Sequence, residues 1–216
     1  MAKNENILVF CAHSDDQIFG PGGTLAKYAR EGKGIYTIIL TYGTAAMPWL
    51  KEEIAIRTRV NESREVNKIL GGKKVYFFNL IEGKFVDSYE EQNLEENMIN
   101  IIKKIRPSKI FTHSFEDPHP DHRAAYKILM SILDKIKYKG GVYLFDVWNP
   151  LTIRKSKLAK MYVDITETFN IKIKALKCFP SQWTSLAALL WSVYLRAFIH
   201  GFHIHKLFGE RFFKIR

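Results

Sequence analysis

The sequence contains few cysteines, and their positions do not indicate a metal site or a disulfide framework. Cys11 and Cys178 are the two cysteines in 216 residues; both lie in apolar stretches, and no CxxC pair occurs. A zinc knuckle or a disulfide is therefore disfavoured, and we expect two buried free thiols. Free thiols are typical of a reducing compartment, so the sequence predicts a cytoplasmic protein.

Long hydrophobic runs are also missing. The apolar run at residues 7–12 is shorter than the core of a signal peptide and soon meets paired acids, so we expect no secretion signal. The uncharged run at residues 185–195 is too short to cross a bilayer. With 47% hydrophobic and 25% charged residues and no internal repeat, the composition is that of an ordinary globular protein.

Acidic residues are scarce relative to basic ones, with 22 Asp and Glu against 33 Lys and Arg, and the net charge is +11. Such a charge suits a nucleic acid, an anionic membrane surface or an anionic substrate. Much of it lies at expected surface positions, which favours a solvated basic surface. The chain has no helix-turn-helix, zinc-finger or ribonucleoprotein motif, so no specific nucleic-acid partner is expected.

Short apolar segments alternate with longer helix-like ones along the chain. Strands are expected at residues 7–12, 35–41, 75–80, 109–112, 142–147 and 162–165. Helices are expected at residues 23–31, 52–70, 90–105, 121–137 and 167–177. This alternation predicts an α/β fold, a Rossmann-like three-layer sandwich in which helices cover both faces of a mostly parallel central sheet.

Two polar clusters follow strands of the predicted sheet. HSDDQ occupies residues 13–17 after the first strand, and DPHPDH occupies residues 117–122 after the fourth. Open α/β sheets bind ligands at the carboxyl ends of their strands, so we expect the two clusters to meet there. Two imidazoles and one carboxylate suit a catalytic divalent metal, which lowers the pKa of a coordinated water. A spare carboxylate can accept the proton and a spare histidine can stabilise an oxyanion, so the clusters predict hydrolysis of a carbonyl or similar electrophile.

These motifs carry a family resemblance. AHSDDQ and the following GPGGTLAKYAREG resemble the AHPDDE motif and glycine turn of the LmbE-like, or PIG-L, deacetylases. The likeness continues through the RxxE pattern at residues 59–62, FFNLIEG, DPHPDHRAAY and KIKALKCFPSQ, and covers roughly residues 5–185. It implies an enzyme that hydrolyses the N-acetyl amide of an amino sugar or its conjugate, so the expected partner is a small amino-sugar substrate.

The resemblance implies a role for each matching residue. His13, Asp16 and His122 resemble the metal ligands, and the implied metal is Zn²⁺, with Fe²⁺ as the alternative. Asp15 resembles the general base that acts on the metal-bound water.

Four further residues match less central positions of the family. His119 resembles the imidazolium that stabilises the tetrahedral intermediate and protonates the leaving amine, with Asp121 as an orienting carboxylate behind the ligands. Arg59 and Glu82 resemble groups that contact sugar hydroxyls.

The chain departs from the family motif at two positions. Ser14 replaces a proline, which alters the stiffness of the turn, and Gln17 replaces a glutamate, which removes a charge. We expect retuned metal affinity or pKa values rather than an inactive enzyme. His113 lies upstream of the second cluster, where a strand-end histidine satisfied by its neighbours is favoured over a substrate contact.

The same residues also suit other functions, each of which the sequence disfavours relative to a hydrolase. Two histidines and one aspartate also form the facial triad of iron oxygenases, but those enzymes use β-sandwich scaffolds and need no base such as Asp15. A non-catalytic sugar binder is disfavoured because the whole set of candidate catalytic residues is present. A dinucleotide site is disfavoured because the glycine turn at residues 20–23 is not GxGxxG.

The composition changes near the C-terminus. We expect residues 1–184 to form the deacetylase domain and residues 185–216 to form a basic amphipathic extension packed on or near it. Three interpretations of the extension remain open: a core or oligomer-interface helix, a lid over the substrate, or a segment on an anionic membrane surface. The three histidines at positions 200, 203 and 205 fit an amphipathic face better than a second metal site.

Overall fold

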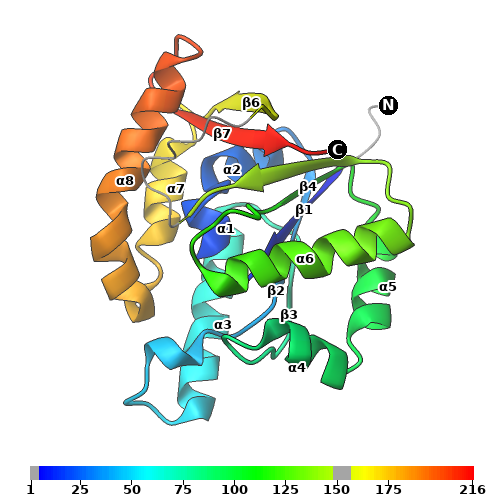
Figure 1. Cartoon of the computed structure of the whole chain (residues 1–216). Helices are drawn as coiled ribbons and strands as arrows, with labels where there is room; N and C mark the ends of the chain where they lie inside the picture. Colours follow the sequence, from blue (N-terminus) through cyan, green and yellow to red (C-terminus); the bar gives the residue numbers. More distant parts are fainter. Residues whose placement is uncertain (1–4, 148–156) are drawn as a thin grey trace.

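Seven strands form one central sheet in the computed structural model, which describes residues 5–147 and 157–216 (Figure 1). The strands are β1 (Asn6–Cys11), β2 (Gly34–Ile39), β3 (Lys74–Phe77), β4 (Lys109–His113), β5 (Gly141–Phe145), β6 (Ala159–Asp164) and β7 (Gly209–Lys214). Their order across the sheet is β3-β2-β1-β4-β5-β7-β6. The pairs from β3 to β5 are parallel, whereas β7 runs antiparallel to both β5 and β6.

Helices cover both faces of this sheet. They are α1 (Asp16–Phe19), α2 (Gly22–Arg30), α3 (Glu52–Ile69), α4 (Phe85–Glu91), α5 (Glu95–Ile105), α6 (Pro120–Lys135), α7 (Phe169–Leu176) and α8 (Trp183–Phe202), with short 3₁₀ turns η1 (Thr44–Ala46) and η2 (Pro180–Gln182). Figure 1 shows α6 in front of the sheet and α2 behind it.

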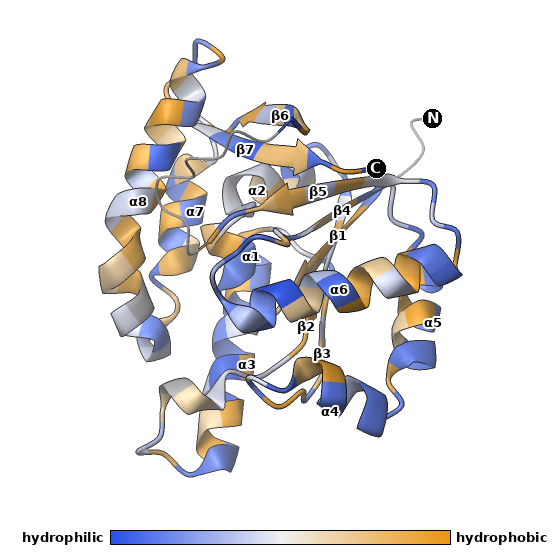
Figure 2. Ribbon diagram, viewed as in Figure 1, coloured by the Kyte–Doolittle hydropathy of each residue, from blue (hydrophilic) through white to orange (hydrophobic). Residues whose placement is uncertain are grey.

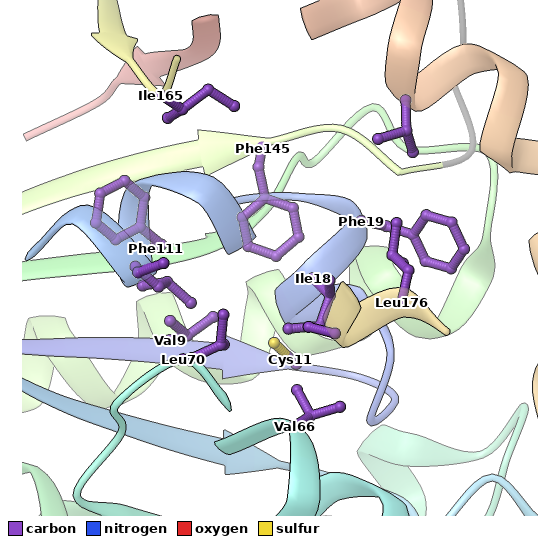
Figure 3. Close-up of a cluster of buried hydrophobic side chains, with 14 of the residues drawn as sticks. Val9, Cys11, Ile18, Phe19, Val66, Leu70, Phe111, Phe145, Ile165 and Leu176 are labelled. Atoms are coloured by element: carbon purple, nitrogen blue, oxygen red, sulfur yellow. The ribbon is translucent and has the colours of Figure 1, made fainter. Parts of the chain in front are cut away.

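The alternating side chains of β1 divide the core into two halves. Ile7, Val9 and Cys11 join one cluster with residues of α1, α2, α3, α7 and α8 (Figure 3). Leu8 and Phe10 join the other cluster, with residues of α4, α5 and α6. Successive residues of a strand face opposite sides of a sheet, so a strand buried on both sides is apolar at every position. The predicted three-layer α/β sandwich is therefore confirmed.

Three features of the fold differ from what the sequence led us to expect. The helix expected at residues 90–105 is two helices, α4 and α5, because Asn93 between them adopts a left-handed backbone with φ of 51°. β7 was not expected, and it lies inside the sheet between β5 and β6. The boundary expected between residues 184 and 185 falls inside α8.

The expected free thiols are confirmed, since Cys11 is buried and unbonded and Cys178 is free and partly buried. Figure 2 shows apolar residues concentrated along the sheet and along α8. Among the helices of the described ranges, none combines the length and the hydropathy that a bilayer-spanning segment requires.

Candidate active site

The two polar clusters meet where the strand order reverses. From β1 the chain proceeds outward through β2 and β3, whereas β4 and β5 lie on the other side of β1. The crevice between the carboxyl ends of β1 and β4 is the switch point at which doubly wound sheets bind ligands. The loop after β1 leads into α1, which begins at Asp16, and the loop after β4 leads into α6, whose first turn contains His122.

The Asp16 carboxylate lies at the centre of the clustered side chains. One of its oxygens accepts the backbone N–H of His13 at 2.7 Å and lies 3.1 Å from Nε2 of His113. The other oxygen lies 3.2 Å from Nε2 of His122. Burial alone would raise the pKa of Asp16, but the charge of the facing His122 ring holds it well below its ordinary value. Asp16 is therefore an ionised carboxylate fixed by several contacts.

The expected ligands His13, Asp16 and His122 come together as one group whose donor atoms lie within 4.8 Å of one another. Two other groups in the described residues share members with it: His13, His119 and Asp121, and His113, Asp117 and His122. The last of these is fully buried, so water and substrate do not reach it. The His13, Asp16 and His122 group joins a buried imidazole to two side chains that border a pocket.

The histidines of this group show that the site favours positive charge. Burial opposes protonation of His13, but the carboxylates of Asp121 and Asp16 outweigh it and raise its pKa to about 10. The pKa of His122 rises to about 9 because Asp16 and Asp117 outweigh its burial in the same way. Nε2 of His122 is buried without an aligned hydrogen-bond partner among the described residues. A divalent cation would supply the charge that these protons supply, so the residues present fit a metal.

Two carboxylates orient the imidazoles of this group. Asp117 lies 3.0 Å from Nδ1 of His122, and Asp121 lies 3.5 Å from Nε2 of His13 while accepting the Gly83 N–H at 2.9 Å. Carboxylates that contact ligand histidines fix the ring orientation and the tautomer. Asp121 was expected in this role from its motif, whereas Asp117, which belongs to the same DPHPDH motif, was not.

His113 is a buried structural residue with no exposed surface. Its Nε2 accepts the backbone N–H of Ala12 at 3.0 Å, and its ring stacks on His122 with 3.8 Å between centroids. Burial lowers the pKa of His113 to about 4, so the ring is neutral. This geometry agrees in part with a strand-end histidine satisfied by its neighbours, because Nε2 has a partner whereas the buried Nδ1 has no hydrogen-bond partner among the described residues.

Asp15 is the residue before α1 and borders the pocket. Burial and the adjacent Asp16 raise the pKa of its carboxyl group, while the guanidinium of Arg59 and the ring of His13 act in the opposite direction. A raised pKa makes a carboxylate a better proton acceptor, which is the property a general base needs. Asp15 thus borders the same pocket as His13 and Asp16, but its carboxylate is not part of the His13, Asp16 and His122 group of donor atoms.

His119 precedes α6 as its N-cap and also borders the pocket. Its Nδ1 accepts the backbone N–H of Asp121 at 3.2 Å, so the neutral ring carries its proton on Nε2. Burial and the neighbouring His122 and His13 lower its pKa. An imidazolium was expected at this position from the sequence. The hydrogen bond from the Asp121 N–H to Nδ1 instead favours a neutral ring that donates from Nε2.

The pocket has a volume of about 430 Å³ and brings together all but one of the expected site residues. The expected residues that line it are His13, Asp15, Asp16, Arg59, Glu82, His119 and Asp121, and His122 lies behind them. Phe19, Val147 and Leu189 also line the pocket, and all three belong to one core cluster. The pocket therefore has a polar side with the catalytic candidates and an apolar side formed by the core.

Arg59 and Glu82 border the pocket but also have structural contacts. The Arg59 guanidinium, 1% exposed, donates to the Tyr42 carbonyl at 3.0 Å and to the Ser181 hydroxyl at 3.2 Å. Glu62 accepts the backbone N–H of Ser181 at 3.0 Å and also bonds to its hydroxyl. The RxxE pattern thus anchors the SQ segment, while Glu82 accepts the Ala45 N–H at 3.2 Å. Contact of either side chain with a sugar stays a prediction.

Gln17, which replaces the motif glutamate, is fully buried and makes two complementary bonds. Its amide nitrogen donates to the Ser14 carbonyl at 3.3 Å, and its amide oxygen accepts the Thr37 hydroxyl at 2.8 Å. A carboxylate here would place an oxygen against the Ser14 carbonyl. The residue therefore supports the shape of the loop between His13 and Asp16.

We expect Gln17→Glu to lower the free energy of unfolding by about 1–3 kcal/mol, because the buried carbonyl of Ser14 loses its donor. Urea unfolding measures this loss, and Glu53→Gln, which exchanges the same groups on an exposed part of α3, is the control. The catalytic rate should not rise. A gain of orders of magnitude would instead show that the native site is impaired by its departure from the family motif.

Comparison with known proteins agrees with this geometry. Residues 8–133 match the family described as PIG-L: GlcNAc-PI de-N-acetylase. The chain belongs to this family. It is 25% identical over 227 residues to a diacetylchitobiose deacetylase from Thermococcus kodakarensis, which covers 96% of the chain and 80% of the relative. PIG-L deacetylases are amide hydrolases that act on N-acetyl amino sugars and their conjugates, so the predicted family and enzyme class are confirmed.

A second relative catalyses a different reaction. The chain is 25% identical to 4-oxalmesaconate hydratase from Pseudomonas putida over 218 residues, which covers 89% of the chain and 78% of that enzyme. Among solved structures, an N,N'-diacetylchitobiose deacetylase from Pyrococcus horikoshii superposes with a TM-score of 0.80 over 98% of this chain and 84% of its own. At 22% identity that likeness shows the shared fold.

Proposed function

We propose that this PIG-L family member is a zinc-dependent N-deacetylase that cleaves the N-acetyl amide of an amino sugar or its conjugate. The observation that carries the proposal is the position of Asp15, which borders the same pocket as His13 and Asp16 but stands outside their donor group. A free carboxylate beside the ligands is one of the groups that a metal-dependent hydrolase can use as the general base for the attacking water.

Each residue has a distinct role in the proposed reaction. His13, Asp16 and His122 would hold Zn²⁺, which when bound acidifies water and polarises the substrate carbonyl. Asp15 takes the proton from the attacking water. His119 donates a hydrogen bond from Nε2 to the oxygen of the tetrahedral intermediate. Asp15 then gives the proton it took from the water to the leaving nitrogen, so that the C–N bond breaks and acetate and a free amine are released.

The charge of the pocket favours a substrate without carboxylates. The pocket is lined by four carboxylate side chains, those of Asp15, Asp16, Glu82 and Asp121, against two cationic groups, the Arg59 guanidinium and the His13 ring, whose pKa is about 10. Acidic groups thus outnumber basic ones. Carboxylates accept hydrogen bonds from sugar hydroxyls but repel other anions. The apolar side formed by Phe19, Val147 and Leu189 offers contact for an acetyl methyl or an apolar substituent. An N-acetylated sugar meets both requirements.

Hydration is the second candidate reaction, because one of the relatives is a hydratase. The same activated water would add to a carbon–carbon double bond instead of an amide carbonyl. The substrate named for that relative is a carboxylate, and four carboxylates in the pocket disfavour its binding. The acidic lining therefore favours deacetylation.

A paired assay of metal-stripped and metal-loaded protein tests the proposal. The panel holds N-acetylglucosamine, diacetylchitobiose, N-acetylglucosaminyl conjugates and an unsaturated dicarboxylate, and free amine, acetate and loss of alkene absorbance are measured. We expect amine and acetate in equal amounts with one equivalent of Zn²⁺, and neither after chelation. Alkene loss without amine release would replace the proposal with hydration. Equal activity of stripped and loaded protein would overturn the role of the metal.

A further inference from the structure

Helix α8 has two apolar faces, and one of them packs on the rest of the chain. Its inner face carries Leu189, Val193 and Ala197, which are 2–4% exposed and repeat every four residues. Leu189 also lines the candidate active-site pocket. Residues at this spacing share one side of a helix, so the inner face of α8 is the side that packs against the hydrophobic core.

The opposite side of α8 is left exposed by residues 5–147 and 157–216, the part of the chain that the structure describes. We define the α8 outer face as Trp183, Trp191, Tyr194, Leu195, Phe198, Ile199 and Phe202, which are 38–75% exposed. The positions 191, 195, 198 and 202 follow a helical stripe, and a 20-residue helix is about 30 Å long. In Figure 1, α8 lies at the edge of the molecule.

The α8 outer face carries no charge. Arg196 is the one Lys, Arg, Asp or Glu residue between positions 183 and 202, and it turns away from the outer face. Its guanidinium donates to the Asp146 carbonyl at 2.7 Å, and its Nε lies 3.4 Å from the Ser192 carbonyl. Charge depletion together with Trp, Tyr and Phe enrichment is the composition of the centre of a protein–protein interface.

The size of the outer face also suits an interface. Its five aromatic side chains are 44–75% exposed, and at about 200 Å² each they present roughly 600 Å². Leu195 and Ile199 add to this area. A stable complex buries about 800 Å² on each partner, and the largest apolar patch on a typical monomer measures about 300–600 Å², so this face is at the upper end of the range for a monomer and near the size of an interface.

We propose that the α8 outer face is the contact surface of a homodimer, in which the face packs against the same face of a second copy across a two-fold axis. An apolar face can pair with itself because it brings no like charges together. A helix that lies on an anionic membrane carries Lys and Arg on its flanks. The outer face has none, and Lys206 beyond its end lies 3.6 Å from Asp164. A second copy therefore fits better than a lipid surface.

Dimerisation would also affect the pocket. The same helix that contacts the second copy carries Leu189 into the candidate active site, so pairing would hold one pocket wall in place. The dimer itself does not depend on which bond the enzyme cleaves.

Light scattering coupled to size exclusion, across a hundredfold range of protein concentration, tests the proposal. The wild-type protein should elute at twice the 25.1 kDa chain mass. Trp191→Ala and Phe198→Ala should each weaken dimerisation by about thirtyfold, the size of a hot-spot effect, and Trp191→Glu with Phe198→Glu should give a monomer. Trp49→Glu alters a 74% exposed tryptophan elsewhere and should leave the dimer intact.

Circular dichroism and zinc content separate loss of pairing from loss of fold. The monomeric variant should keep the wild-type helix signal and bind one zinc. A wild-type monomer at every concentration overturns the proposal, and so does a dimer that persists in the Trp191→Glu, Phe198→Glu variant. Flotation with phosphatidylserine vesicles is the second arm, in which a wild-type monomer that binds the vesicles assigns the outer face to a lipid surface instead.

Discussion

Replacing Asp15 with asparagine should lower kcat by about a hundredfold to ten-thousandfold, because the attacking water loses its proton acceptor. The side chain keeps its shape, and Asp15 stands outside the donor group of His13, Asp16 and His122. Zinc content and KM should therefore change little. Amine release at saturating substrate measures the rate, and atomic absorption measures the bound metal.

The control for this variant is Asp87→Asn, which makes the same chemical change at an exposed position of α4. It should behave as wild type. An Asp15→Asn enzyme with full activity would remove Asp15 from the mechanism. An inactive enzyme that also lost its zinc would make Asp15 a ligand, and the roles proposed for the polar side of the pocket would have to be reassigned.

Replacing Lys172 with methionine should lower the free energy of unfolding by about 3–5 kcal/mol, the usual cost of leaving one member of a buried ion pair without its partner. Lys172 is 4% exposed, and its Nζ donates to Glu210 at 2.7 Å and to the carbonyls of Phe19 and Gly20 at 3.1 and 2.8 Å. Burial lowers the pKa of Lys172, although Glu210 opposes this shift. All three acceptors would lose a donor at once.

The same substitution should also weaken metal binding, because Phe19 ends the short helix α1 that begins with Asp16. Glu210 accepts the N–H groups of Gly23 and Thr24 at 2.9 and 2.8 Å, so the pair fixes both sides of the turn between α1 and α2. Urea unfolding and zinc titration measure the two effects. Lys206→Met, at a half-exposed lysine 3.6 Å from Asp164, is the control and should cost no more than about 1 kcal/mol.

A stability loss in Lys172→Met no larger than in the control would show that the turn is held by other contacts. Addition of Glu210→Gln tests the pairing directly. Since it removes the charge that Lys172→Met leaves unpaired, the double variant should lose less stability than the sum of the two single variants.

The sequence predicted the candidate catalytic residues better than it predicted the contacts that hold them in place. The candidate ligands and Asp15 follow two parallel strands, and the topology of an α/β sheet brings such positions together. Arg59 shows the limit of this reasoning. Its motif indicated a sugar contact, but its side chain also bonds to Ser181, which is 122 residues away in the sequence. Contacts between such distant segments follow from the packing of the whole chain and not from a local pattern.

β7 illustrates a second limit. Its sequence, GERFFK, combines a buried acid with adjacent aromatics, and it follows a segment with helical character. Glu210 looks like a surface residue until its partner is known, and that partner is Lys172 on α7. A buried charge is tolerated only when it is paired. A single sequence does not reveal this pair, so the strand that contains Glu210 was overlooked.

The contacts of Glu210 bear on when the enzyme becomes active during its synthesis. The loop that contains the candidate ligands is translated early, but the carboxylate that caps the following helix is 187 residues further along the chain. At about 5–20 residues per second, the ribosome needs roughly 10–40 s to add that stretch. Once β5 has been made, the nascent chain has all five of its parallel strands but still lacks β7, which pairs with both β5 and β6. His13 and Asp16 are thus among the first residues of the active site to be made, whereas the turn that follows them is among the last parts to be completed.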